Sequence, residues 1–263
     1  MSESCTLDVA DGVATLSLAR PEVHNAFDET LIAKLAAHLA ELDADPGVRV
    51  VVLAGQGRSF CAGADLGWMR RMAAFGRTEN LADAQALAAM LRALATLAKP
   101  TIARVHGAAF GGGVGLVAAC DIAVGADTAQ FALSEARLGL IPATISPYVI
   151  EAIGARAARR YFLTAERFTA AEAQRIGLLH EAVAADALDA RIAAIVALLV
   201  EAGPAAQRES KRLVRDVAGR PVDAGVIATT AERIADVRAS SEGREGVAAF
   251  LARRRPEWIA SRE

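Results

Sequence analysis

Two glycine-bearing segments stand out because their backbone can approach a ligand closely. SFCAGADL covers residues 59–66 and FGGGVGL covers residues 110–116. Glycine loses more backbone freedom on folding than other residues, so consecutive glycines indicate a place where side chains are not tolerated. Backbone N–H groups at the start of a helix have no partner within it and lie at the positive end of its dipole. One N–H from each segment, aimed at one point, would form an oxyanion hole for a developing negative oxygen.

Two alternatives to an oxyanion hole would also account for the glycines. Glycines permit tight turns and close packing of a helix on a strand. In addition, Gly113, Gly115 and Ala118 match the dinucleotide fingerprint G-x-G-x-x-A, and Glu135 lies at about the distance of its acidic partner. That match is weak, because HGAAF separates it from the preceding strand and CAGAD stays unexplained.

The elements that must position these segments begin with a hairpin. CTLDVADGVATLSLAR predicts two short strands joined by a turn at residues 11–12. Asp28 is expected to cap a helix through ETLIAKLAAHLAEL, whose apolar residues have helical spacing. The β-branched run VRVVVLAG (48–55) predicts a buried parallel strand. One helix is expected over 68–98, ended by the Lys-Pro pair that follows it.

The rest of the chain divides into a mixed part and a helical part. TIARVHG (101–107) and CDIAVGA (120–126) predict strands, with a helix opening within the glycines between them. Strands that alternate with helices indicate an α/β fold with right-handed crossovers. Beyond about residue 165 no further strand is expected, and the predicted helices cover 170–176, 186–202, 204–217, 222–238 and 241–251. This tail could pack on the core or on a neighbouring subunit.

Composition narrows the class of protein. The 263 residues are 54% hydrophobic and 23% charged, which predicts a sizeable core. The net charge of -2 favours neither a nucleic acid nor an anionic membrane as partner. Cys5, Cys61 and Cys120 show no metal-ligand spacing, so no metal site is expected. Because the first residues lack the features of a signal peptide and no apolar run is long enough to cross a bilayer, we expect a cytoplasmic protein.

Six segments together resemble the enoyl-CoA hydratase/isomerase (crotonase) superfamily. In family order they are RPEVHNAF (20–27), SFCAGADL, KPTIARVHGAAFGGG (99–113), CDIAVGADTAQFALSEARLGLIP (120–142), RRYFLTAERFTAAEAQRIGLL (159–179) and EGREGVAAFLARRRPEW (242–258). The resemblance implies an α/β, crotonase-like fold of repeated ββα units. It implies a catalytic core over 1–200 and a helical trimerisation region over 201–263, in trimers that often pair as hexamers.

The resemblance also implies an enzyme acting on an acyl-CoA thioester, with no cofactor besides the coenzyme A of the substrate. The backbone N–H groups of Ala64 and Gly112 would hold the thioester oxygen, and Glu135 would be the catalytic acid/base. The residues implied in substrate binding are Val23, Ala62, Ala64, Asp65, Leu66, Gly67 and Gly112.

One departure from the family pattern bears directly on the mechanism. Hydratases of the superfamily use two glutamates; the second corresponds to Glu135, but the first falls at Gly115, which has no side chain. Glu135 alone could move a proton, as in isomerases, or act as the sole acid/base for addition of water. A glutamate there could also be only an exposed carboxylate, or a carboxylate in a salt bridge for which Arg137 is a candidate partner. A working base should instead show a pKa raised by burial.

A second departure concerns the substrate. The segment ATISPYVIEAIG, which follows GLIP, is similar to the branch of methylglutaconyl-CoA and isohexenylglutaconyl-CoA hydratases, enzymes of leucine and acyclic-terpene breakdown. Such substrates carry a second carboxylate, for which Arg70, Arg71 and Arg77 are candidate partners. For each of these arginines taken singly, a solvated helix face is the better explanation.

For several further residues, a structural role is an alternative to a functional one. His24 and His106 precede tight loops, where local hydrogen bonding is expected. Cys61 is expected to fill a small space beside its loop. Arg253–Arg255 either form a solvated helix end or contact the coenzyme A phosphates of an adjacent subunit.

Three functions stay open after these observations: a hydratase, a double-bond isomerase using one glutamate, and a non-catalytic protein that binds CoA esters or RNA.

Overall fold

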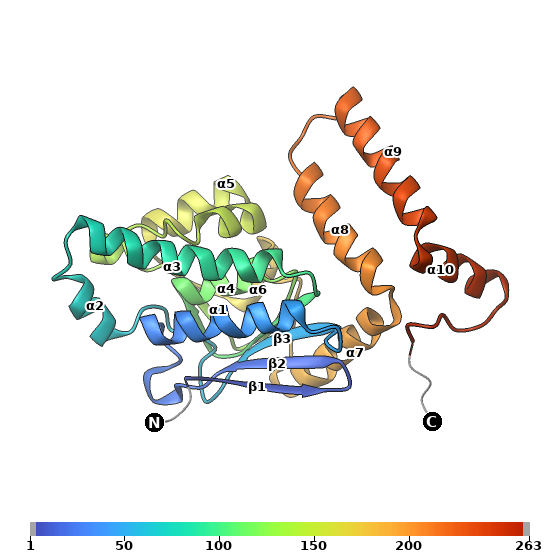
Figure 1. The fold of residues 1–263 in the computed structure, drawn as a ribbon. Helices are drawn as coiled ribbons and strands as arrows, with labels where there is room; N and C mark the ends of the chain where they lie inside the picture. The colour runs from blue at the N-terminus through green and yellow to red at the C-terminus, as the bar shows by residue number, and fades with distance from the viewer. Residues whose placement is uncertain (1–3, 260–263) are drawn as a thin grey trace.

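Two sheets form the framework of the protein in the computed structural model, which describes residues 4–259 (Figure 1). The larger sheet has the order β1-β2-β3-β4-β6-β9, and only β1 and β2 are antiparallel neighbours. Its strands are β1 (Cys5–Ala10), β2 (Val13–Leu18), β3 (Val50–Gly55), β4 (Thr101–Val105), β6 (Ile122–Ala126) and β9 (Glu181–Val183). The smaller sheet consists of β5 (Ala108–Phe110), β7 (Gln130–Ala132) and β8 (Arg167–Thr169), in the order β5-β7-β8.

The N-terminal hairpin and the first helix are confirmed. Asp11 and Gly12 have φ of 50° and 77°, the left-handed conformation that a tight two-residue hairpin requires. The carboxylate of Asp28 accepts a hydrogen bond from the Leu31 N–H at 2.8 Å, at the start of α1 (Glu29–Ala44). This cap supplies a partner for an amide that the helix itself leaves without one.

Helices cover both faces of the larger sheet (Figure 1). Val50 and Val52 of β3 pack with α7 (Leu188–Glu201) in one buried cluster, whereas Val51 and Leu53 belong to the main core with α1. Side chains alternate between the faces of a strand, so burial on both faces requires a continuous apolar run. This explains VRVVVLAG and confirms the predicted strand.

The prediction of a single helix over 68–98 is wrong. The structure has α2 (Leu66–Met72) and α3 (Arg77–Thr96), separated by a short turn. The Gly76 N–H donates to the Glu79 carboxylate at 2.6 Å, which provides a new helix start inside the apolar periodic stretch. The periodicity alone did not reveal this interruption.

The expectation of no strand beyond residue 165 is also wrong. β8 pairs with β7, and β9 extends the larger sheet beside β6. Each has three residues, too few for an alternating pattern to be recognised. Two further elements, β5 and α5 (Ser146–Thr164), were not predicted; α5 bends at Gly154, where φ is 72°.

The helical tail matches its predicted segments closely. After α6 (Ala170–Arg175) and α7 come α8 (Pro204–Val217), α9 (Ala224–Ala239) and α10 (Ser241–Leu251). Figure 1 shows α8, α9 and α10 projecting beyond the sheets and the helices packed on them. Within residues 4–259, no helix combines the length and apolar character needed to cross a membrane.

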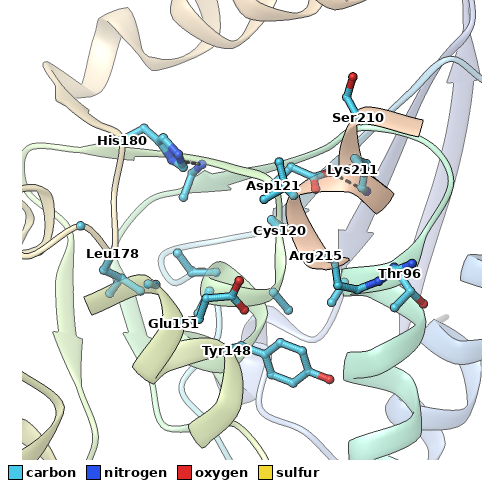
Figure 2. Close-up of a pocket in the computed structure, with 18 residues that line it drawn as sticks. Thr96, Cys120, Asp121, Tyr148, Glu151, Leu178, His180, Ser210, Lys211 and Arg215 are labelled. Atoms are coloured by element: carbon cyan, nitrogen blue, oxygen red, sulfur yellow. Dashed lines mark hydrogen bonds and ion pairs between the residues drawn. The ribbon is translucent and has the colours of Figure 1, made fainter. Parts of the chain in front are cut away.

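An ion pair connects α8 to the core. Lys211 lies 2.6 Å from Asp121, which also accepts hydrogen bonds from the backbone N–H and hydroxyl of Thr101 at 2.7 and 2.9 Å. Beside this pair, at the C-terminal end of α4 (Gly112–Ala119), lies a cavity of about 670 Å³, walled by α5 residues Tyr148 and Glu151 (Figure 2). The glycine segments lie at the opposite end of α4.

Candidate active site

The two glycine-bearing segments lie against each other. The Phe110 N–H donates to the Cys61 carbonyl at 2.9 Å, and the Cys61 N–H donates to the Ala108 carbonyl at 3.0 Å. Gly63 has a φ of 92°, and a Cβ there would lie 3.1 Å from the Phe110 carbonyl oxygen. The backbone conformation and the close approach both require glycine. The two loops whose amides are predicted to converge on one point are therefore in contact.

Each glycine of the triplet faces a different neighbour. A Cβ on Gly112 would lie 2.8 Å from the Phe27 ring, and one on Gly113 would lie 3.0 Å from the Cys61 Cβ. A Cβ on Gly111 would lie 3.1 Å from Oε1 of Glu135. Close protein packing thus explains two of the glycines, and the third leaves space for a carboxylate.

The dinucleotide fingerprint is not supported by this arrangement. The spaces beside Gly113 and Gly115 are filled by Cys61 and Ile145, which leaves no opening there for a pyrophosphate. The acidic partner of the fingerprint, Glu135, lies instead over Gly111. We therefore correct that interpretation.

The backbone amides of Ala64 and Gly112 are at the edges of these loops. Phe27 donates its N–H to the Gly63 carbonyl and accepts from the Asp65 N–H, both at 2.7 Å, so the intervening Ala64 amide takes no part in this bridge. Gly112 is the first residue of α4, where helical N–H groups lack a partner within the helix. Among residues 4–259, neither amide has a hydrogen-bond partner, and Ala64 is exposed.

Asp65 holds the loop that carries Ala64. Its carboxylate accepts from the N–H groups of Gly67 and Trp68 at 2.7 and 3.0 Å and caps α2. Arg20 lies 3.2 Å from Asp65 and 2.9 Å from Asp28, so one guanidinium joins two loops. Burial raises the pKa of Asp65, but the two amides and Arg20 outweigh it and hold that pKa below its usual value. Of the residues predicted to bind substrate, Asp65 thus has its carboxylate engaged within the protein.

Changing Asp65 to alanine is expected to lower the free energy of unfolding by about 1–2 kcal/mol, since a helix cap is lost. The lowered pKa means that the ionised carboxylate stabilises the fold above the usual pKa of Asp, and that this contribution disappears as pH falls through the folded-state pKa. Urea denaturation at neutral and acid pH would measure this, with Asp65→Asn as the control that keeps a capping oxygen. An equal loss at both pH values would contradict the assigned ionic role.

Glu135 begins a 3₁₀ helix, Glu135–Leu138, and its carboxylate lies over the glycine loop. Its Oε2 is buried and has no hydrogen-bond partner among the described residues. Burial raises the pKa of Glu135 above its usual value, opposed in part by its own backbone N–H. This confirms the property expected of a working base, and an exposed carboxylate paired with Arg137 does not describe it. A buried carboxylate oxygen without a hydrogen-bond partner is unfavourable to folding, which is typical of a group kept for chemistry.

The position of the first family glutamate is filled by another residue. A Cβ on Gly115 would lie 2.8 Å from the Cβ of Ile145 and closer still to its Cγ2. Ile145 immediately precedes α5 and is buried. Ile145 was not predicted as a site residue, because a single apolar residue in ATISP gives no signal of its own.

Exposed apolar side chains lie close in sequence to both parts of the site. Leu66 follows the Ala64 loop and is 71% exposed, and Ile141 follows the Glu135 turn and is 77% exposed. Leu138 and Leu140, on the same turn as Glu135, are also exposed. Exposed apolar residues that form a patch are typical of a binding surface, so these four side chains are candidates for contact with a ligand.

The remaining candidates fall into two groups. Val23 ends the 3₁₀ helix Pro21–Val23, and the carbonyl of the next residue, His24, accepts from the Ala62 N–H at 3.0 Å, so the predicted binding residues Val23 and Ala62 belong to neighbouring loops. His24 Nδ1 lies 3.0 Å from the Ser59 hydroxyl, and His106 Nε2 lies 2.9 Å from the Gly57 carbonyl. Both histidines make structural hydrogen bonds, but to a segment 35 and 49 residues away in the sequence rather than within their own loops, as was expected.

Cys61 and two of the candidate arginines are unsuited to the functional roles considered for them. Cys61 is buried, and burial raises the pKa of its thiol to about 12, which fits a packing residue. Arg71 pairs with Glu29 at 2.7 Å, and Arg254 pairs with Glu245 at 2.6 Å. The other candidates on these two segments, Arg70, Arg77, Arg253 and Arg255, are exposed.

Comparison with known proteins gives a consistent result. Residues 8–261 match the family model described as enoyl-CoA hydratase/isomerase. Enoyl-CoA hydratase ACTT6 of Alternaria alternata is 37% identical over 241 residues, which cover 91% of this chain and 78% of that protein. The crystal structure of an enoyl-CoA hydratase from Shewanella pealeana has a TM-score of 0.95 and 42% identity, covering 97% of this chain and 96% of the other. AtuE of Pseudomonas aeruginosa has a TM-score of 0.93 and 35% identity, covering 98% and 100%. The chain belongs to the enoyl-CoA hydratase/isomerase family.

Proposed function

We propose that this protein is an enoyl-CoA hydratase, which adds water across the conjugated double bond of an acyl-CoA thioester. The observation that carries the proposal is the half-buried Glu135 carboxylate, whose Oε1 lies over the glycine loop that precedes α4 and whose buried Oε2 has no hydrogen-bond partner in the described structure. The amides of Ala64 and Gly112 are the proposed donors to the thioester oxygen. The names of family relatives, such as ACTT6, support the same activity.

One carboxylate suffices for the proposed reaction. The Glu135 carboxylate takes a proton from water as the water oxygen bonds to the β-carbon. The electron pair of the double bond moves to the thioester oxygen, where two amides stabilise the enolate. As the enolate collapses, the α-carbon takes the proton back from Glu135. The net addition is one water molecule, and Glu135 returns to its ionised form.

A double-bond isomerase is the second candidate, and the packing of Ile145 beside Gly115 favours it. Glu135 would then remove a proton from one carbon of the enoyl chain and return it to another, with the same enolate between the two steps. No water is consumed in that reaction. A non-catalytic CoA-ester binder is the third candidate, against which the unpartnered carboxylate argues.

The proposed substrate is of the methylglutaconyl-CoA type. The apolar side chains of Leu66, Leu138 and Ile141 would contact the branched carbon chain. Arg70 or Arg77 would pair with its distal carboxylate, since Arg71 is occupied by Glu29. These contacts are inferred from exposure and from position in the chain.

The proposed assembly is a trimer or a pair of trimers, with residues 1–200 as catalytic core and 201–263 as oligomerisation region, whose last four residues lie outside the described part. Ile227 of α9 and Val247, Phe250 and Leu251 of α10 are exposed apolar residues that such contacts would cover. Sedimentation analysis would test the assembly directly.

The reaction can be tested with crotonyl-CoA and methylglutaconyl-CoA in water enriched in oxygen-18. Hydration predicts loss of the conjugated thioester absorbance and a product that carries the heavy oxygen. A changed absorbance without label would favour isomerisation and overturn the hydratase proposal. No change with either substrate, together with measurable binding of the ester, would favour the non-catalytic binder.

A further inference from the structure

Ile145 occupies a place that bears on the proposed reaction. Its side chain is 2% exposed, and its Cβ would lie 2.8 Å from a Cβ on Gly115. The Gly115 N–H donates to the Gly111 carbonyl at 3.2 Å, one helical turn earlier. Gly111, which immediately precedes α4 and has a non-helical backbone, faces Glu135, whereas Gly115, in the first turn of α4, faces Ile145. Glu135 and Ile145 therefore contact two residues whose backbones are joined by this hydrogen bond at the start of α4.

We propose that Ile145 is a positioning residue for the reaction, because it fills the space beside Gly115 and keeps both a second side chain and water from beneath the Glu135 carboxylate. This inference rests on the catalytic role proposed for Glu135. Ile145 would thereby restrict the site to one carboxylate and keep that carboxylate poorly solvated. A β-branched residue suits the task, since its Cγ2 methyl is the group nearest to Gly115.

Burial is the main influence on the pKa of Glu135, because the charged groups near it are exposed or paired with other residues. Arg137 on the same turn is exposed, and Arg167 of β8 lies over an aromatic ring of β5. Asp65 is ion-paired with Arg20 of a separate loop. The glycine loop carries no charge, and Tyr148 in the first turn of α5 lines the cavity at the other end of α4 (Figure 2). The raised pKa of Glu135 has desolvation as its largest cause, in agreement with an apolar surrounding.

The first test compares the pH profile of kcat/KM for the full-length protein with the profiles of two variants, Ile145→Ala just before α5 and Val149→Ala within it. Ile145→Ala would admit water beneath Glu135, lower its pKa and move the acid limb to lower pH, by about half a unit or more. Val149→Ala is the matched control, because Val149 lies one turn later and is 0% exposed but does not adjoin Gly115. It should lose thermal stability similarly and leave the limb in place. Ile145→Val, which keeps the Cγ2 methyl, should retain the original profile.

The second test removes the steric conflict in two steps. Gly115→Ala alone should lose most activity, because its methyl group meets Ile145. The double variant with Ile145→Ala should recover about tenfold in kcat/KM over Gly115→Ala, which is non-additive behaviour expected of residues in contact. If Ile145→Ala does not fold, Ile145→Leu, which keeps the volume but lacks the β-branch, serves in its place.

Failure of this inference differs from failure of the proposed function. An unchanged acid limb in Ile145→Ala, with turnover still abolished by Glu135→Gln, would overturn the role of Ile145 alone. Turnover that survives Glu135→Gln would overturn the role of Glu135. In that case the packing of Ile145 against Gly115 could still be tested, because the changes in unfolding free energy caused by the two substitutions should not be additive.

Discussion

Glu135→Gln is expected to reduce kcat by about 10²–10⁴-fold, the range attributed to a positioned general acid or base. Glutamine keeps the size of the side chain but cannot take a proton from water at the β-carbon. Binding of a saturated acyl-CoA should change little, since the proposed oxyanion donors are backbone groups. Stopped-flow absorbance of the enoyl thioester and calorimetric binding would measure the two properties separately.

The stability of this variant provides its control. Burial raises the pKa of Glu135, so the ionised carboxylate destabilises the fold as pH rises through the folded-state pKa. Glu135→Gln should therefore be at least as stable as the parent protein at neutral pH, and the two should converge in acid. A strong loss of stability at neutral pH would contradict the assignment of Glu135 as a buried, unpartnered carboxylate.

Ala64→Pro is expected to lower kcat by about 10²–10³-fold, as removal of one oxyanion-hole donor does in other enzymes. Proline has no backbone N–H, and the bridge between this loop and Phe27 uses only the Gly63 carbonyl and the Asp65 N–H. The variant therefore deletes the proposed donor and leaves those bonds available.

The matched control at this position is Ala64→Gly, which keeps the N–H group. It should retain kcat within about tenfold, since it changes only the flexibility of the loop. Comparable losses in the proline and glycine variants would point to loop geometry as the cause and would argue against the amide as a donor. Circular dichroism would verify that both variants fold.

Long or strongly patterned elements were predictable from sequence. The Asp28 cap, the β-branched run of β3 and the helical periods of α8 and α10 each carry a local signal that the fold preserves. Elements that depend on distant partners were missed. β8 and β9 exist because β7 and β6 offer free edges, and three residues cannot encode that in a hydrophobic pattern.

The site was predictable to a similar extent. The glycines and Glu135 were found from their types and from the family resemblance, and the structure brings Gly63, Gly111 and Glu135 together. The reason for each glycine was not visible in the sequence, because Phe27, Cys61 and Ile145 come from three separate segments. Only tertiary contacts show that Gly112, Gly113 and Gly115 make room for protein, whereas Gly111 makes room for a carboxylate.

The central claim, that two loop amides hold the thioester oxygen beside one carboxylate, can be tested by vibrational spectroscopy of a bound ester. The Glu135→Gln protein would be mixed with crotonyl-CoA labelled with carbon-13 at the thioester carbonyl. We expect the carbonyl stretch to move to lower frequency when the ester binds to the Glu135→Gln protein. In the double variant that also carries Ala64→Pro, the stretch should lie close to its value in solution. A bound ester whose carbonyl frequency equals that in water would contradict the claim.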